Sequence, residues 1–369
     1  MSGHGFSNQA IVFEASCLSL PYTGIAQYTA NLALALARLG EPTAAVLRTK
    51  DFDPARTEEL VAGNVSIRRP PAALQNLLLM SERLGHQIGY DRLAGGARAI
   101  IFPNNRMFDS KVPSLATLHD LSPVVYPEFV DPVWRARAAR RMHEIAEKAS
   151  IVLTVSETVA NQITSVLGVP HDRIRVIRMV TPARAAPSDS VPGVPGAVLA
   201  VGTLGRNKNY NRLILAHKML DPLARSKHPL VIVGREGYGA AEIMVAAEND
   251  PYIIMTGGLS DTRLASMYRD AALFVQVSLY EGFGIPPLEA LAANKPVLCS
   301  DIPALRESTE SRADIYVNPY DVGLIADSIN RLLDSEYNSH SAAHEDRSTH
   351  SWDSAARVLL RAIEDASNL

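Results

Sequence analysis

The chain is short of cysteine, of net charge and of long apolar runs, and each shortage narrows what it can be. Its two cysteines, Cys17 and Cys299, lie far apart and outside any metal-ligand spacing, which is consistent with a reducing cytosol. The net charge of -3 gives no electrostatic footprint for nucleic acid. No stretch reaches the roughly 18 consecutive apolar residues that cross a bilayer, and residues 1–9 lack the apolar region of a signal peptide. We therefore expect a cytoplasmic protein, soluble or peripheral on a membrane, with no nucleic-acid partner.

Hydrophobic residues, in contrast, make up 47% of the 369 residues, enough to form two cores of about 150 to 200 residues each. Short apolar runs alternate with helical patterns in both halves, which is typical of parallel sheets covered on both faces. The sequence predicts an α/β fold with two doubly wound parallel-sheet domains. The predicted strands are 10–14, 44–47, 99–102, 115–118, 151–155 and 174–177 in the first half, and 197–201, 230–233, 252–255, 273–277, 296–299 and 315–317 in the second.

The segment at 180–196 is rich in proline and small polar residues and has no apolar periodicity, so we interpret it as an interdomain linker. It separates a domain at 1–179 from a second domain at 197–350. Residues 351–369 contain a further helical pattern. We expect the two domains to face one another across a cleft that holds the ligand.

The most informative run, 278–300, follows the apolar strand at 273–277. Pro286 and Pro287 suit the first turn of a helix, and Asn294 can end that helix in a left-handed conformation. The turn before the helix would leave unpaired backbone NH groups at the carboxyl end of a strand, an arrangement that suits a diphosphate. Glu281 before the turn and Glu289 in the first helical turn would flank this site and accept hydrogen bonds from sugar hydroxyls.

Polar residues also follow two other predicted strands, whose carboxyl ends line the ligand crevice of an open parallel sheet. His119 and Asp120 follow one strand, where the imidazole can contact a sugar hydroxyl and Asp120 can orient it. Lys208, with Arg206 as a second cation, follows another and can neutralise a bound diphosphate.

Two predicted helix starts complete the pattern. Gly24 opens a helix that Gly40 closes, and a glycine there would let backbone approach a ligand. Ser156 can cap a helix at 157–167, a structural role that needs no ligand.

The string EGFGIPPLEA at 281–290 resembles the paired glutamates, seven residues apart, of the retaining glycosyltransferase family 4. Segments similar to this family also occur at 22–40, 117–120, 202–209 and 256–284, so the resemblance spans nearly the whole chain. It implies the two-lobed GT-B fold, with the helix at 351–369 packing back on the first domain. One position departs from the pattern, since Asn207 stands where the family has an arginine directly before Lys208.

The resemblance implies a hexosyltransferase that moves a sugar from a nucleoside diphosphate to a glycan or lipid-linked glycan acceptor, with no metal or other cofactor. The VGTL and EGFG strings look most like mannosyltransferases of surface-polysaccharide assembly, which favours GDP-mannose as donor, with UDP-sugars next. By this analogy Lys208 and Glu281 act on the donor at the catalytic centre and His119 contacts the donor sugar or the acceptor. The expected substrate-binding residues are Gly24, Asp120, Thr203, Arg206, Gly282, Phe283, Gly284, Ile285 and Glu289.

Three other functions remain open from the sequence. A related enzyme could epimerise or hydrolyse a nucleotide sugar, and a phosphorylase would need a pyridoxal-binding lysine motif that we do not find. A non-catalytic sugar-nucleotide-binding or scaffolding protein is supported only by the displaced Arg206.

Two weaker patterns concern metal and membrane. Asp51 and Asp53 have the spacing of a metal-binding pair, which chance explains better in a polar loop. The helix predicted at 132–150 carries four arginines near Trp134 and could lie on the anionic inner face of a membrane, although such a face is usually solvated.

Overall fold

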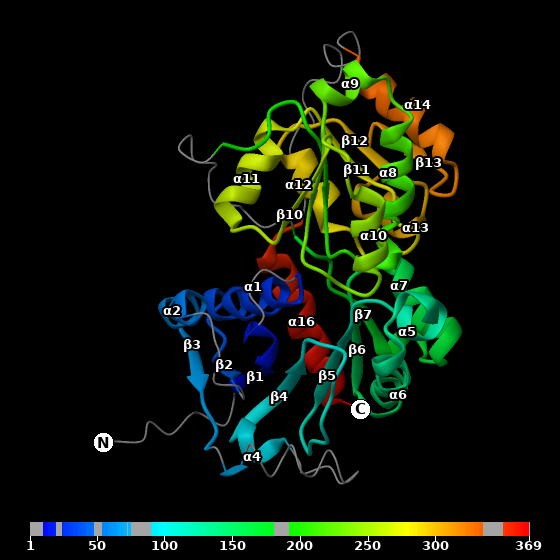
Figure 1. Cartoon of the computed structure of the whole chain (residues 1–369). Helices are drawn as coiled ribbons and strands as arrows, with labels where there is room; N and C mark the ends of the chain where they lie inside the picture. Colours follow the sequence, from blue (N-terminus) through cyan, green and yellow to red (C-terminus); the bar gives the residue numbers. More distant parts are fainter. Residues whose placement is uncertain are drawn as a thin grey trace. The chain divides into compact units, whose positions relative to one another are not determined.

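The computed structural model describes residues 10–19, 24–47, 54–71, 73–74, 90–180, 192–334 and 350–368. Most of the predicted linker and the pair Asp51 and Asp53 lie outside these residues. Contacts divide the chain into two compact units (Figure 1). The first unit comprises 1–121, 136–180 and 348–369, and the second comprises 122–135 and 181–347.

The first unit contains a seven-stranded parallel sheet in the order β3-β2-β1-β4-β5-β6-β7. All five residues of β1 are buried, so the centre of this sheet is covered on both faces. The strands are β1 (Ala10–Glu14), β2 (Thr43–Val46), β3 (Val65–Arg68), β4 (Ala97–Phe102), β5 (Ser114–Leu118), β6 (Ile151–Thr154) and β7 (Ile174–Val176).

Helix α16 (Trp352–Ser367) packs beside α1 (Gly24–Arg38), although more than 300 residues separate them in the sequence (Figure 1). Arg38 on α1 donates to Asp353 on α16 at 2.7 Å.

Two predicted helix ends are present in the first unit. Gly40 follows α1 with φ 85°, and Ser156 caps α7 (Glu157–Leu167). The other helices are η1 (Ser16–Ser19), α2 (Pro54–Ala62), α4 (Asp91–Ala94), α6 (Pro132–Lys148), whose first four residues group with the second unit, and η3 (His171–Arg173).

The second unit contains a six-stranded parallel sheet in the order β10-β9-β8-β11-β12-β13. Its strands are β8 (Val198–Val201), β9 (Leu230–Val233), β10 (Ile253–Gly257), β11 (Leu273–Gln276), β12 (Val297–Ser300) and β13 (Ile315–Val317). Helix α8 (Tyr210–Lys218) packs between α10 (Ala240–Ala247) and α14 (Val322–Leu333), and α11 (Asp261–Asp270) and α12 (Ile285–Ala292) lie on the other side of the strands (Figure 1). Shorter elements are α5 (Ser122–Val125), η2 (Pro127–Phe129), η4 (Arg206–Lys208), α9 (Pro222–Lys227) and α13 (Pro303–Ser308).

The predicted α/β fold with two parallel sheets is confirmed, and each predicted strand is present within two residues at either end. The predictions missed β3, an edge strand in which only Val65 is buried. An edge strand of this kind has no continuous apolar run, so its sequence gives little signal.

Candidate active site

The predicted donor residues of the second unit gather where β8 and β11, neighbours in its sheet, end. Asn209 adopts a left-handed conformation, φ 59°, after η4, and its side chain donates to the carbonyl oxygens of Val277 and Pro319 at 2.9 and 2.8 Å. The backbone NH of Leu279 donates to the carbonyl of Asn207 at 2.8 Å. These bonds join the loop after β8 to the loop after β11 and so fix Lys208 close to Glu281.

Three donors converge on one carboxylate oxygen of Glu281. Its Oε1 accepts from Lys208 Nζ at 2.7 Å, from Gln276 Nε2 at 2.9 Å and from Ser278 Oγ at 2.6 Å. The side chains of Lys208 and Glu281 are only 15% and 11% exposed, so water screens this ion pair weakly. Burial and the nearby charge of Glu281 raise the pKa of Tyr210, whose protonated hydroxyl donates to the carbonyl of Gly202 at 3.0 Å.

The side chain of Lys208 passes close to the backbone of Gly202, which has no Cβ atom. A Cβ atom at Gly202 would lie 3.0 Å from Lys208 Cε, tighter than nearly all real contacts, so a side chain there would push the lysine aside. One of the three ammonium protons of Lys208 is used in the bond to Glu281. The other two have no acceptor among the residues that the structure describes.

The turn after Glu281 leads directly into helix α12. Gly284 has φ 109°, and a Cβ there would lie 2.5 Å from Leu305 Cδ2, so only glycine fits this position. Phe283 is buried, and Pro286 and Pro287 lie in the first turn, as predicted. Asn294 follows the helix with φ 53°, also as predicted. The helix begins at Ile285, so its first NH groups belong to the predicted anion-binding turn.

Glu289 differs in two ways from the expectation. It is the fifth residue of α12, beyond the first turn, because the helix begins at Ile285. It is also buried, with 5% exposure, and its Oε2 accepts from the hydroxyl of Tyr268 at 2.7 Å. The sequence predicts a carboxylate that accepts from a sugar hydroxyl, whereas in the structure Glu289 packs against α11.

Arg206 does not join Lys208. Its guanidinium forms an ion pair with Glu242 on α10 and lies over the ring of Tyr238, 4.6 Å from the ring centroid. The bond to Glu242 raises the pKa of Arg206. Thr203 is exposed in the same loop. The displacement of the arginine by one residue therefore directs its side chain to a different partner.

The remaining predicted site residues belong to the first unit. His119 follows β5, and its Nε2 lies 2.7 Å from the carbonyl oxygen of Pro103, which makes Nε2 the protonated nitrogen of a neutral ring. Burial lowers the pKa of His119, although the Pro103 carbonyl and the charge of Asp120 oppose this. Tyr28 on α1 contacts the imidazole edge to face, with ring centroids 5.1 Å apart. Gly24 is exposed at the start of α1.

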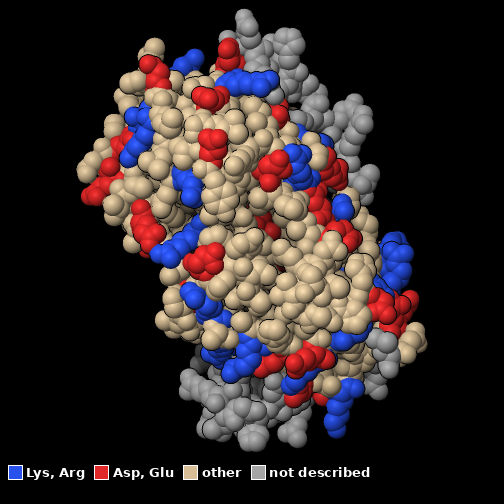
Figure 2. All heavy atoms as spheres, turned by 90° about the vertical axis from the view of Figure 1, so that its right-hand side faces the viewer, with Lys and Arg blue, Asp and Glu red and all other residues tan. Residues whose placement is uncertain are grey.

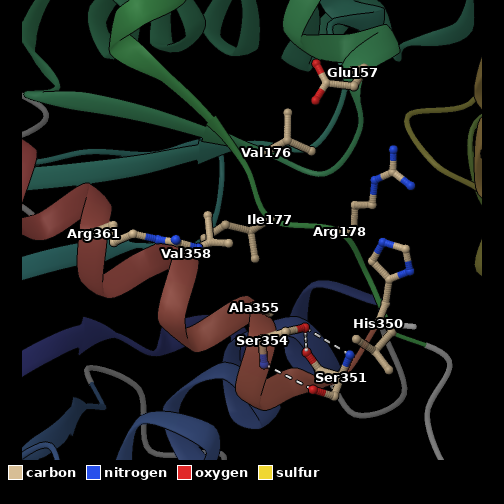
Figure 3. Close-up of a pocket in the computed structure, with 11 residues that line it drawn as sticks. Glu157, Val176, Ile177, Arg178, His350, Ser351, Ser354, Ala355, Val358 and Arg361 are labelled. Atoms are coloured by element: carbon tan, nitrogen blue, oxygen red, sulfur yellow. Dashed lines mark hydrogen bonds between the residues drawn. The ribbon is translucent and has the colours of Figure 1, made fainter. Parts of the chain in front are cut away.

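The first unit also contains a cavity of about 250 Å³ between the end of β7 and the first half of α16 (Figure 3). Ser351 and Ser354 cap the helix there, and Arg178 and Arg361 lie at opposite ends of the cavity (Figure 3). None of the predicted site residues lines it.

Sequence reasoning missed three residues that hold the predicted glutamates: Gln276, Ser278 and Tyr268. Gln276 is a polar residue in an otherwise apolar strand next to a motif, and that contrast is the signal that could have identified it. Tyr268 lies in the buried stripe of α11 and looks like a core residue until Glu289 is placed beside it.

Comparison with known proteins identifies the family. Residues 22–179 match the profile described as Glycosyltransferase Family 4, and residues 189–350 match the profile described as Glycosyl transferases group 1. The chain belongs to the glycosyltransferases that carry these two domains.

Two relatives are mannosyltransferases by name. The chain is 31% identical over 242 residues to O-antigen chain mannosyltransferase B of Escherichia coli, with 60% of this chain and 62% of that protein covered. It is 32% identical over 208 residues to O-antigen chain mannosyltransferase RfbU of Salmonella typhimurium, with 56% of each covered. The chain thus spans less than two thirds of the length of these relatives.

A solved structure shows the same fold over the whole chain. Anabaena HepE in complex with UDP and glucose matches with a TM-score of 0.64 at 14% identity, covering 98% of this chain and 100% of that one. The two-domain GT-B type of fold is therefore confirmed for this glycosyltransferase.

The described residues contain no group of three or more histidine, cysteine or acidic side chains arranged to hold a metal ion. In the same residues no helix has the length and hydrophobicity that crossing a bilayer requires.

Proposed function

We propose that this glycosyltransferase moves a hexose from a nucleoside diphosphate sugar to a glycan or lipid-linked glycan acceptor in surface-polysaccharide assembly. The observation that carries the proposal is the pairing of Lys208 with Glu281 at the strand ends of the second unit. A cation for a diphosphate and a carboxylate for a sugar are thereby held side by side, next to the first NH groups of α12.

We propose mannose from GDP-mannose as the transferred sugar. The support is that both curated relatives are named as O-antigen mannosyltransferases, each at just over 30% identity. A UDP-sugar is the second candidate, supported by the fold shared with a protein that was solved with UDP and glucose.

The donor site can assist departure of the diphosphate without a metal ion. The two remaining protons of Lys208 and the NH groups of Gly282 to Ile285 would bind the phosphate oxygens and stabilise the charge that develops on them. The open oxygen of Glu281 would accept a hydrogen bond from a hydroxyl of the donor sugar. Glu289 would hold the ribose hydroxyls once its carboxylate shifts from Tyr268.

We propose transfer with retention of the anomeric configuration by attack on the front face. The bond between the anomeric carbon and the phosphate oxygen breaks while the acceptor oxygen bonds to that carbon on the same face. The proton of the acceptor hydroxyl passes to the departing phosphate oxygen. His119, kept neutral by burial, would bind a hydroxyl of the donor sugar or the acceptor through Nδ1.

The same proposal includes a location at the inner face of the cell membrane. Val133 and Trp134 on α6 are 77% and 58% exposed, and Arg137 and Arg140 are exposed farther along this helix. Figure 2 shows basic and acidic side chains mixed over the face that it draws, without a large area of one sign. Sedimentation with anionic and with neutral vesicles tests this contact, and equal recovery of wild type and Trp134→Ala would exclude it.

The experiment for the activity is a donor panel of GDP- and UDP-sugars with lipid-linked and simple glycan acceptors, in the presence of EDTA. Product with a retained anomeric configuration is expected with GDP-mannose. Sugar release without an acceptor would favour the hydrolase alternative, and binding without turnover would favour the non-catalytic one.

A further inference from the structure

Gln276 is a buried polar side chain in which only one of the two polar atoms has a hydrogen-bond partner among the described residues. It is the last residue of β11 and is 5% exposed. Its amide nitrogen donates to Glu281 Oε1 at 2.9 Å. Its carbonyl oxygen is buried and has no partner among the described residues.

The orientation of this amide follows from its partner. An ionised carboxylate only accepts hydrogen bonds, so the NH₂ group of Gln276 must face Glu281 and its carbonyl must face away. A buried carbonyl without a donor opposes folding, and an apolar side chain of similar size would remove that penalty. The unpaired carbonyl of Gln276 therefore opposes folding, and such a group is typical of a residue retained for another reason.

The effect on Glu281 is a defined orientation. Gln276, Ser278 and Lys208 all donate to Oε1, and no described residue donates to Oε2. Since the carboxylate cannot turn without losing all three bonds, Oε2 keeps one direction. A Cβ at Gly284 would lie 3.9 Å from Gln276 Nε2, so the amide is also close to the turn that leads into α12.

We propose that Gln276 is a positioning residue, which fixes the carboxylate of Glu281 so that Oε2 is presented to a hydroxyl of the donor sugar. This inference rests on the proposed function of the same site. Lys208 alone would not fix the carboxylate in this way, because a single flexible ammonium group can follow a carboxylate that rotates.

The decisive variant is Gln276→Leu, because a positioning role and a purely structural role predict different kinetics. The thermal midpoint should change little, since removal of the unpaired carbonyl offsets the loss of one donor to Glu281, whose carboxylate keeps its bonds to Lys208 and Ser278. The ratio kcat/KM for the donor should fall about tenfold, the factor that corresponds to ~1.4 kcal/mol. A purely structural role predicts a lower midpoint with unchanged kinetics, and that result would overturn the proposal.

Ser300→Ala is a matched control on the neighbouring strand. The hydroxyl of Ser300 is also buried without a partner, but Cys299 is the residue opposite Gln276, so Ser300 faces the other side of the sheet. This variant should keep the wild-type kinetics.

Gln276→Glu tests for rescue by a side chain of similar shape. The protonated carboxyl of the new residue can donate to Glu281 Oε1, whereas its ionised form repels Glu281. Its activity relative to wild type should therefore rise as the pH is lowered, and a ratio that is independent of pH would count against the proposal.

A double-mutant cycle tests whether Gln276 acts through Glu281. In the Glu281→Ala background, Gln276→Leu should change the donor affinity or residual kcat/KM less than twofold, whereas an undiminished tenfold loss would overturn the proposal. If the wild type transfers no sugar at all, the proposed function fails, and crystal structures then decide the positioning role. A turned or disordered Glu281 carboxylate in Gln276→Leu supports it, and an unmoved carboxylate refutes it.

Discussion

Lys208 Nζ lies 2.7 Å from Glu281 Oε1, although 73 residues separate the two in the sequence. The pair joins two strand-end loops through opposite charges in a largely water-excluded place. Under the proposed function, the diphosphate of the donor would bind Lys208 and its sugar would bind Glu281, so the pair would couple the two parts of the donor.

Replacing Lys208 should affect catalysis far more than folding. Lys208→Met removes the cation proposed to stabilise the leaving diphosphate, and we expect kcat to fall about 10²- to 10³-fold, as when a preorganised donor is lost. Glu281 keeps its bonds to Gln276 and Ser278, so the variant should remain folded. Steady-state kinetics and thermal unfolding measure both effects, and Lys208→Arg should recover part of the rate. A Lys208→Met enzyme with the wild-type kcat would remove the lysine from the mechanism.

The ribose role of Glu289 can be separated from its contact with Tyr268. Glu289→Ala should weaken binding of the nucleotide sugar, and the loss should vanish when the nucleotide lacks the ribose 2′- and 3′-hydroxyls. Tyr268→Phe leaves the buried carboxylate short of one donor, so it should cost about 1–3 kcal/mol of unfolding free energy. Calorimetric titrations with the normal and the deoxy nucleotide check the first effect. Equal donor affinity of wild type and Glu289→Ala would show that this glutamate is only structural.

Arg206 should matter much less for the donor than Lys208. Its guanidinium is held by Glu242 and Tyr238, so we expect Arg206→Ala to change the dissociation constant of the donor by less than about threefold, the scale of an exposed contact. Glu242→Gln is the variant to compare with Arg206→Ala, because it removes the carboxylate that holds the Arg206 guanidinium. Titrations of the two variants side by side decide the question, and a loss in Arg206→Ala as large as that in Lys208→Met would show that the loop rearranges on binding.

Acidification should destabilise the fold partly through His119. Burial lowers the folded-state pKa of His119 below its unfolded value of about 6.5. The unfolded chain then binds the proton first, so the stability that is present above about pH 6.5 is lost as the pH falls below it. His217, whose pKa burial also lowers, acts in the same direction. Unfolding midpoints from pH 7.5 to 5 should fall less steeply in His119→Gln than in wild type, and parallel curves would refute the shift.

His119 should also affect the rate of transfer. His119→Ala removes the nitrogen proposed to bind a sugar hydroxyl, and we expect it to slow transfer more than it weakens donor binding, by about 10²-fold in kcat. Single-turnover measurements at saturating donor separate the two quantities. An unchanged rate would exclude His119 from the mechanism.

Much of the fold could be predicted because buried parallel strands have continuous apolar sequences. Val198–Val201 and Leu230–Val233 show no polar interruption, and their positions could be read almost residue for residue. Val65–Arg68 could not be read in this way, since an edge strand exposes one side and three of its residues are only partly buried.

The sequence indicates which polar residues follow the strands but not which contacts they make. Lys208 and Glu281 stand out by type and by position after strands, yet a sequence contains no information on which cation meets which carboxylate. Gln276 looked like part of a core strand, and Arg206 looked like a phosphate ligand until Glu242 on α10 was seen to hold it. These pairings depend on side-chain directions across elements, which spacing along the chain does not specify.

The proposed role of Lys208 is tested most directly by calorimetric titration of GDP-mannose, GDP and UDP into the wild-type protein and into Lys208→Met, in buffer containing EDTA. We expect the wild type to bind at least one nucleoside diphosphate without metal, and Lys208→Met to bind it at least tenfold more weakly. Wild-type protein that binds none of the three, or a variant with undiminished affinity, would contradict this role.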